Sequence, residues 1–374
     1  MAAELTNFPR ESTLREVANA LNVIAFAQAG NIGSIENWRA VQQLVRNGLG
    51  PQAFPVGTQL AVNHSVYGTR LFDVVAHDYL KSVHDESAHT MTIMQHDLLP
   101  SVQFDAPEAF YYAETQLAAG TYSFTIPFTS SLWEMGSYQF TLTNPVPAGG
   151  QLAIGGNSGA RQVQSYASRT ATSAIESVAI TSGSGGTNLG TFGEELNYPH
   201  RVVYGSNNYK ESAVRQFLNS SAAAGSVWVP QTKFDRPPTW ITTLAGYMGG
   251  LDADFLAAVG EVVLPCSANN QYEAPDSTVI QNTAYTLNDA FYLASCAEVF
   301  GSHEVNDGSV LFPFYNSADN ADRIKYRDGS AAIWWLRTPY IGHAHTARRV
   351  FTTGGMDISY VVDGAGIAPA CTIV

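Results

Sequence analysis

Two groups of histidines are the first residues of this sequence that could bind a metal ion or transfer a proton. One group is dispersed between two apolar segments, at positions 77, 84, 89 and 96. Its spacing fits no zinc-ligand pattern, and HDESAH differs from the HExxH of zinc proteases. The other group, His343 and His345 with Asp363, could be drawn as an acid–base or metal site, but Gly, Ala, Ser and Thr surround it. We therefore predict no metal site and no cofactor.

The cysteines and the hydroxyl residues offer no better case for catalysis. Cys266, Cys296 and Cys371 are an odd number, lie far apart and form no CxxC pair, so we interpret them as buried free thiols of a protein made in a reducing compartment. No GxSxG, P-loop or recognisable Ser/His/Asp set occurs. The sequence predicts that the protein is not an enzyme.

Between positions 341 and 363 the sequence follows no core pattern. Large side chains of unrelated chemistry are spaced by very small ones, which suits a contact surface better than a core. Tyr, Phe, Arg and Met are common at protein interfaces, and rigid aromatic rings supply contact area at low entropic cost. The residues that stand out are Ile341, His343, His345, Arg349, Phe351, Met356, Tyr360 and Asp363.

The segments on either side of this stretch have the composition of a buried framework. A bulky apolar run, WWLRTP, precedes it at 334–339, and a short apolar terminal strand, GIAPAC, follows it at 366–371. We expect Trp334, Trp335 and Leu336 to be buried. Residues 347–353 and 357–363 alternate enough to form two short strands, with Gly354-Gly355 as the turn between them.

Composition excludes several classes of protein. The chain has 374 residues, 45% apolar and 14% charged, with a net charge of −13 and no basic run, so we expect no nucleic-acid partner. The N-terminus lacks the pattern of a signal peptide, and no apolar run reaches the ~20 residues of a membrane span. We expect no membrane insertion, and release by lysis or on an assembled particle.

Changes of hydrophobic period divide the chain into four parts. Residues 1–50 read as two short helices, the second capped by Ser34. Period-two strands begin at 51 and continue to 105. Residues 106–198 are poor in Lys and Arg and rich in turns, which predicts an inserted small β-sandwich. Residues 199–374 mix strands with short helices. The expected fold class is α+β.

Five segments carry a resemblance to a known family. They are YGSN at 204–207, SAVRQFLN at 212–219, FYLAS at 291–295, WWLRTP at 334–339 and GIAPA at 366–370. Together they resemble the C-type-lectin-fold domain of the DUF6273 type, which occurs in phage and gut-bacterial proteins. The C-terminal part is also similar to variable proteins of diversity-generating retroelements, the class of the phage major tropism determinant.

The resemblance implies a C-type lectin fold in which residues 51–105 and 199–374 form one domain. It also implies that region 340–365 is diversified on a constant scaffold of Gly342, Ala344, Ala347, Val350, Gly354 and Gly364. Asparagine, which such templates encode at variable positions, is absent from this region. The implied ligand-binding positions are Ile341, His343, His345, Thr346, Arg349, Phe351, Met356, Asp357, Ser359, Tyr360, Val362 and Asp363.

The leading hypothesis is therefore a receptor-binding protein on a phage particle that recognises a host-surface protein or glycan by surface complementarity. Its N-terminal segment or inserted domain would contact other virion proteins, and a homo-oligomer would add avidity. One alternative is a structural protein of a virion or bacterial surface that binds glycans without calcium, since the calcium-ligating tripeptides of lectins are absent. The other is an enzyme of the formylglycine-generating type, which the separated cysteines disfavour.

Overall fold

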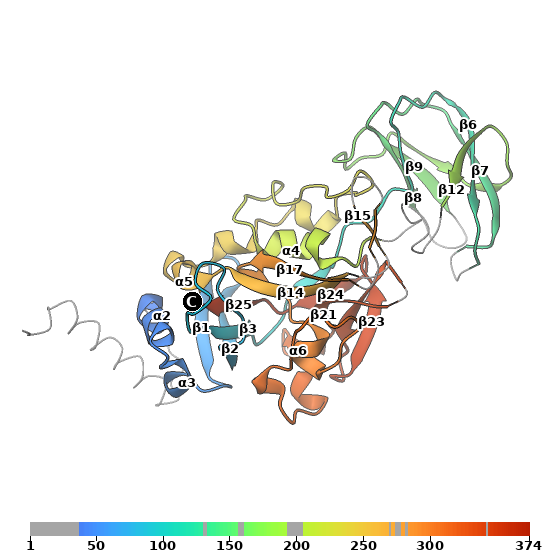
Figure 1. The fold of residues 1–374 in the computed structure, drawn as a ribbon. Coiled ribbons are helices and arrows are strands. Elements are labelled where there is room, and N and C mark those ends of the chain that lie inside the picture. The colour runs from blue at the N-terminus through green and yellow to red at the C-terminus, as the bar shows by residue number, and fades with distance from the viewer. Residues whose placement is uncertain are drawn as a thin grey trace, which may run out of the picture.

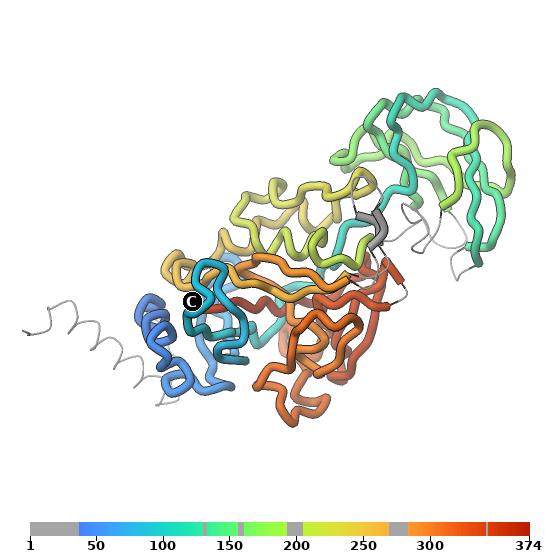
Figure 2. The backbone as a smooth tube through the Cα atoms, in the orientation of Figure 1, coloured from blue at the N-terminus to red at the C-terminus, as the bar shows by residue number. Residues whose placement is uncertain are grey.

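The computed structural model describes residues 37–129, 133–155, 161–192, 205–268, 271–273, 278–280, 283–341 and 343–374. Figures 1 and 2 show a large body that contains the blue and the red segments of the described chain, and a smaller body built from green segments in the middle of the sequence. The first helix predicted in region 1–50 lies outside the described residues. The second is α2 (Trp38–Arg46), and Asn37 caps it instead of Ser34, with its side chain accepting from the Ala40 amide.

A six-stranded antiparallel sheet joins the beginning and the end of the chain. Its last strand, β25, lies between β3 and β13, so that the C-terminus is held inside the sheet. Trp38 of α2 packs against Phe255 of α5 (Ala253–Ala258) with ring centroids 4.6 Å apart. The strands are β1 (Gln59–His64), β2 (Gly68–His77), β3 (Met91–Gln95), β25 (Ala370–Ile373), β13 (Val259–Gly260) and β18 (Phe291–Tyr292).

A five-stranded sheet carries the region of interest, in the order β23-β22-β21-β24-β4. Every residue of the central strand β21 is buried, and Trp334, Trp335 and Leu336 are wholly inaccessible. The prediction that these three residues are buried is therefore confirmed. The strands are β4 (Leu99–Gln103), β21 (Trp334–Pro339), β22 (Thr346–Val350), β23 (Met356–Tyr360) and β24 (Gly364–Ile367).

The terminal apolar segment is not the single strand that its composition predicts. It passes from one sheet to the other: β24 pairs with β4 and β21, whereas β25 pairs with β3, β13 and β18. Pro369 lies at the crossing because it has no amide hydrogen to donate to a ladder. Its carbonyl accepts from the Gln95 amide at 2.8 Å, which continues the pairing with β3.

The remaining elements of the large body are short. The α-helices are α3 (Gly50–Ala53), α4 (Ala213–Leu218), α5 (Ala253–Ala258) and α6 (Cys296–Phe300). The 3₁₀ helices are η1 (Tyr209–Glu211), η2 (Thr239–Thr242), η3 (Tyr247–Gly250), η4 (Pro313–Tyr315) and η5 (Ala321–Arg323). Three hairpins complete it: β14 (Val262–Ala268) with β17 (Thr283–Asp289), β15 (Gln271–Glu273) with β16 (Thr278–Ile280), and β19 (Lys325–Arg327) with β20 (Ser330–Ala332).

The smaller body consists of two four-stranded sheets with a hydrophobic core of their own. Phe110, Phe124 and Phe140 lie at the centre of this core, and Arg236 of the large body donates to the Gln151 side chain at its edge. One sheet contains β5 (Tyr111–Tyr112), β8 (Gln151–Gly155), β9 (Gln162–Tyr166) and β10 (Glu176–Ala179). The other contains β6 (Gly120–Ile126), β7 (Gly136–Leu142), β11 (Thr181–Ser182) and β12 (Thr187–Thr191).

The prediction of an α+β fold is wrong. Strand accounts for 39% and helix for 16% of the structure, and the fold is largely β. The helical patterns that suggested α+β are real but short. The short helices expected in residues 199–374 include α4 and α5, which have six residues each. Such short helices are not stable alone, so the paired strands of the sheets determine the architecture.

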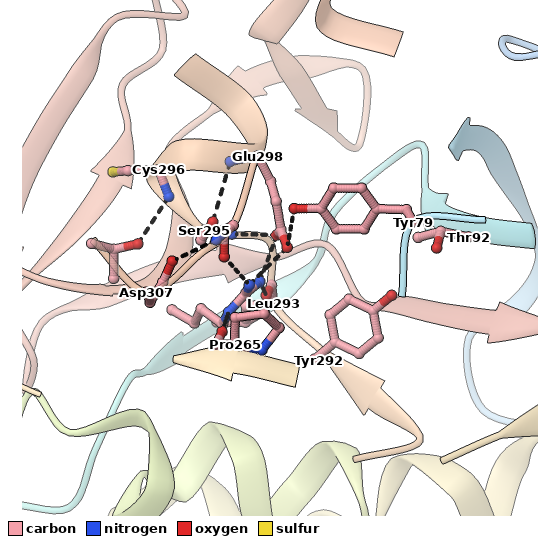
Figure 3. A network of polar contacts seen from close by, with 12 residues as sticks. Tyr79, Thr92, Pro265, Tyr292, Leu293, Ser295, Cys296, Glu298 and Asp307 are labelled. Atoms are coloured by element: carbon pink, nitrogen blue, oxygen red, sulfur yellow. Dashed lines mark hydrogen bonds and ion pairs between the residues drawn. The ribbon is translucent and has the colours of Figure 1, made fainter. Parts of the chain in front are cut away.

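An ion pair between Arg337 of β21 and Glu298 of α6 lies in the interior. Its N–O distances are 2.5 and 2.7 Å, and both side chains are inaccessible. Glu298 also caps its own helix by accepting from the Ser295 amide, and it accepts from the Tyr79 hydroxyl (Figure 3). Arg337 donates further to the carbonyls of Pro265 and Leu293. The pair therefore joins the centre of the five-stranded sheet to α6 and to β14.

We predict that Glu298→Gln lowers the free energy of unfolding by ~3–5 kcal/mol, because the Arg337 charge stays buried without its counter-ion. The double variant Arg337→Met/Glu298→Leu should be more stable than Glu298→Gln, since it removes both charges together. Chemical denaturation of the three proteins measures the difference. Glu114→Gln, which breaks the exposed pair with Lys233, is the matched control and should change stability little. A double variant that is no more stable than Glu298→Gln would contradict this account.

A second prediction concerns His64, at the end of β1. Its Nδ1 accepts from the amides of Val66 and Tyr67, and its Nε2 lies 3.0 Å from the Tyr247 carbonyl, so the neutral ring fits the site. Burial lowers the pKa of His64 below its usual value.

As the pH falls through ~6.5, the unfolded chain protonates this histidine before the folded protein does, so stability decreases. The advantage in melting temperature of the wild type over His64→Gln should therefore shrink between pH 7 and pH 5. His84→Gln, at an exposed histidine, should show no such trend. A difference that is constant with pH for His64→Gln would overturn the assignment.

Candidate functional site

The hairpin of β22 and β23 is the frame of the candidate site. Its strands pair without a break from Thr346↔Tyr360 to Val350↔Met356, and Arg349 forms an ion pair with Asp357 across the strands at 2.8 Å. Gly354 adopts a left-handed φ of +78° in the turn, as three-residue hairpin loops require. A Cβ atom there would lie 1.6 Å from the Asn320 carbonyl oxygen. The predicted hairpin is present, with strands shorter than expected.

The turn that leads into the hairpin, residues 340–346, closes around the side chain of Asn207. This buried amide donates to the carbonyls of His343 at 2.8 Å, Thr346 at 2.9 Å and Tyr340 at 3.4 Å. Its backbone amide donates to the Ala344 carbonyl at 2.8 Å. All four contacts are to backbone atoms of the turn. Asn207 therefore sets the path of the main chain whatever side chains the turn carries.

Four rings form a continuous row from this turn to the end of β23. Tyr340 contacts His343 edge-on with centroids 5.4 Å apart, and His343 stacks on His345 at 5.5 Å with an angle of 5°. Tyr360 lies 5.5 Å from His345. His343 and Tyr360 are exposed and Tyr340 is half-buried, whereas His345 supports the row from the interior. The exposed rings suit contact with amphipathic ligands.

Arg348 and Glu304 form an ion pair beside this row. Arg348 stacks over the Tyr340 ring, with its guanidinium carbon 4.7 Å from the ring centroid. Glu304 also accepts from the Ile341 amide at 3.2 Å. The loop after α6 is thus attached to the 340–346 turn, and the charge of Arg348 is neutralised where it meets the rings.

The structure gives the twelve predicted ligand-binding residues three different environments. The exposed ones are Ile341, His343, Phe351, Met356, Tyr360 and Asp363, and the half-buried ones are Arg349, Asp357, Ser359 and Val362. The remaining two, His345 and Thr346, are each only 2% exposed. We expected both side chains to be exposed, but they are buried, because the turn folds back onto Asn207 and carries them inward.

The exposed residues also fall into two groups and not one face. Ile341, His343, Tyr360 and Asp363 lie where β23 ends, beside the 340–346 turn. Phe351 and Met356 lie at the other end of the hairpin, four residues along the strand and thus ~14 Å away. Among the residues predicted as scaffold, Ala344, Ala347 and Val350 are wholly buried, whereas Gly364 is exposed and Gly342 lies outside the described residues.

Sequence reasoning missed three residues that build this site. Asn207 lies more than 130 residues before the carbonyls it binds, and its only signal was its place in the YGSN segment. Glu304 lies in a polar stretch that resembles any surface loop. Arg348 is adjacent to a predicted contact residue, but its ion pair depends on the position of Glu304. None of these contacts follows from periodicity.

The described residues bring together no group of three or more His, Cys, Asp or Glu side chains that could hold a metal ion. His343 and His345 stack on each other, and Asp363 accepts from the Ser359 hydroxyl at 2.7 Å. The three cysteines are buried and unpaired, and burial raises the pKa of Cys266 and Cys296 to about 12 and that of Cys371 well above its usual value. At neutral pH their sulfur atoms are therefore thiols and not nucleophilic thiolates.

A family of proteins described as "Domain of unknown function (DUF6273)" matches residues 176–374, more than half of the chain. The chain belongs to the DUF6273 family. The DUF6273 region begins at β10 of the smaller body and includes Asn207, β21 and the whole hairpin. No curated protein and no solved structure matches the chain. In the described part, no helix is both long and apolar enough to span a membrane.

We predict that Asn207→Ala destabilises the protein by ~1–3 kcal/mol, because it removes the donor to three carbonyls of the 340–346 turn, of which the bond to Thr346 is buried. Amide hydrogen exchange of Ala344, His345 and Thr346 should become faster than exchange in β21. Asn306→Ala is the matched control, since the Asn306 side chain is exposed and accepts from the Gly308 amide only locally. Unchanged exchange in the turn of the Asn207 variant would contradict the anchoring role.

Proposed function

We propose that this DUF6273 protein is a binding protein displayed on a phage particle, and that the ends of the β22–β23 hairpin recognise a ligand on the host cell. The observation that carries this proposal is the concentration of exposed apolar side chains. Among the described residues, four of the twelve large apolar side chains that are exposed lie within twenty positions: Ile341, Phe351, Met356 and Tyr360. Ile341 and Tyr360 lie at one end of the hairpin and Phe351 and Met356 at the other, and exposed apolar side chains gathered in this way mark interaction surfaces.

The backbone beneath these side chains supports the proposal. Asn207 and Gly354 hold the two turns through main-chain contacts, and Ala347 and Val350 anchor β22 in the interior. A rigid backbone lowers the entropy that binding must overcome. Because the contacts of both turns are to main-chain atoms, substitutions at exposed positions leave the frame intact. This is the property that a diversified binding surface requires.

A second candidate ligand is a glycan bound without calcium. The exposed rings of His343 and Tyr360 favour it, because aromatic rings pack on the apolar faces of sugars while imidazole nitrogens bond to hydroxyls. We infer further that several copies act together on the particle, or on a bacterial surface, where avidity strengthens weak single contacts. The smaller body, with its own core, is the part we assign to contacts with neighbouring proteins.

Binding of the labelled protein to a panel of intact gut bacterial strains, measured by flow cytometry, tests the proposal. The wild type should label at least one strain. A variant with serine at Ile341, Phe351, Met356 and Tyr360 should lose at least ~tenfold in apparent affinity, about 1.4 kcal/mol. Its melting temperature should change little, because all four side chains are exposed.

The matched control replaces four other exposed apolar residues by serine: Val66, Met135, Val229 and Val310. This control should label the same strains as the wild type. Equal labelling by both variants, or no labelling by the wild type, would reject the hairpin as a host-binding surface. Loss of binding after glycosidase treatment of the cells, but not after protease treatment, would identify the ligand as a glycan.

A further inference from the structure

Strand β23 forms an outer edge of the five-stranded sheet, and within the described residues it pairs only with β22. Two hydrogen bonds at its ends define which way its peptide groups point. The Val361 amide donates to the His345 carbonyl at 3.0 Å, and the Phe351 amide donates to the Gly355 carbonyl at 2.8 Å. Hydrogen-bonded pairs alternate with non-bonded pairs along an antiparallel ladder.

The register between these two bonds makes Ala347↔Ser359 and Arg349↔Asp357 the hydrogen-bonded pairs. Met356, Ile358 and Tyr360 therefore direct their peptide groups away from β22, towards the open edge. In the part of the chain that the structure describes, no hydrogen bond reaches the backbone of Ile358 from beyond the hairpin. The Tyr360 carbonyl already accepts from the Asp363 amide at 2.9 Å. The edge therefore presents the main-chain donors and acceptors of Met356 and Ile358 in the arrangement that accepts another strand.

The usual protections of an exposed edge strand are missing from β23. Proline, lysine and bulges prevent edge strands from pairing with other chains. The sequence MDISY contains neither of these residues, and its register with β22 has no shift. Its one charged residue, Asp357, is paired with Arg349. The two apolar side chains of the strand that are most exposed, Met356 and Tyr360, lie on the same face, with Ile358 between them on that face.

We propose that the open edge of β23 binds an extended segment of a partner polypeptide as an additional strand. This inference rests on the proposed binding function and specifies its mode. The partner segment carries apolar side chains at alternate positions, which pack against Met356 and Tyr360. The partner segment also carries a basic residue near the exposed Asp363, because this chain has a net charge of −13 and attracts positive charge. Its peptide groups bond to those of Ile358.

Strand addition would explain how a surface with varied side chains retains affinity. Hydrogen bonds to the main chain of β23 do not depend on which side chains the strand carries. The side chains beside the edge then select among partner segments. Hydrogen bonds to the main chain of β23 and contacts with the side chains beside it thus contribute separately to affinity. Substitutions can test each contribution alone.

The test uses a synthetic array of linear decapeptides in which valine alternates with randomised positions and lysine occupies one end. Ile358→Pro removes the outward amide of β23 without removing a bond to β22, and edge strands tolerate proline. It should weaken binding to the selected peptides at least tenfold, whereas Ile358→Thr, which keeps the amide, should change binding less than threefold. Circular dichroism and melting temperature report whether each variant is folded.

A second measurement does not require the proline variant to fold. N-methylation of a selected peptide, one nitrogen at a time, should abolish binding to the wild type at alternate positions only, because half of the peptide nitrogens face β23. Amide exchange of Met356 and Ile358 should slow when the peptide binds. Absence of any binding peptide, equal binding by Ile358→Pro, or uniform effects of N-methylation would each overturn strand addition.

The same variants separate this proposal from two others. If the wild type forms a dimer that Ile358→Pro abolishes, and no peptide binds, the occupant of the edge is a second copy of the chain and the partner segment is rejected. If Ile358→Pro labels bacterial cells as the wild type does, while the four-serine variant does not, strand addition fails and the display function stands.

Discussion

The buried ion pair of Arg337 and Glu298 is the interaction on which the rest of the structure depends. Two charges inside a protein are tolerated only when their partners are complete. Here that condition is met by atoms from β21, α6, the segment before α6 and β14. The centre of the five-stranded sheet is thereby attached to the elements around it. The backbone of the hairpin that pairs with β21 therefore has little conformational freedom, as the proposed binding function requires.

In the candidate site, the contacts that hold the backbone are separate from the side chains that are exposed. Asn207 bonds to carbonyls, and Gly354 lies directly against the Asn320 carbonyl. Asn207 thus holds its turn through atoms that every amino acid possesses, whereas the other turn requires glycine at position 354, because a Cβ atom there would clash with Asn320. In the proposed complex, the outward peptide groups of β23 would likewise bind the partner segment through main-chain atoms. A DUF6273 protein built in this way can change its exposed side chains at small cost in stability, and the proposed functions depend on that tolerance.

Much of the local structure could be predicted from residue patterns. Period-two alternation located β1, β2 and β3, and the paired glycines located the turn of the hairpin. The α+β class was wrong because capping signals and apolar stripes predict that a helix begins but not that it ends within six residues. The single terminal strand was wrong because the pattern of residues 366–371 is equally apolar in two different sheets, and only their pairing separates them.

By itself the sequence determined which segments are framework, since Trp334, Trp335 and Leu336 could only be stable in an interior. It also determined that region 341–363 has no core periodicity. The tertiary structure alone decided which of those residues are displayed: it buried His345 and Thr346 and placed the exposed residues at two ends of a hairpin. The physical reason is distance along the chain. Asn207 and Glu304 shape the site from positions whose contacts no local pattern encodes, because they form only when the sheets assemble.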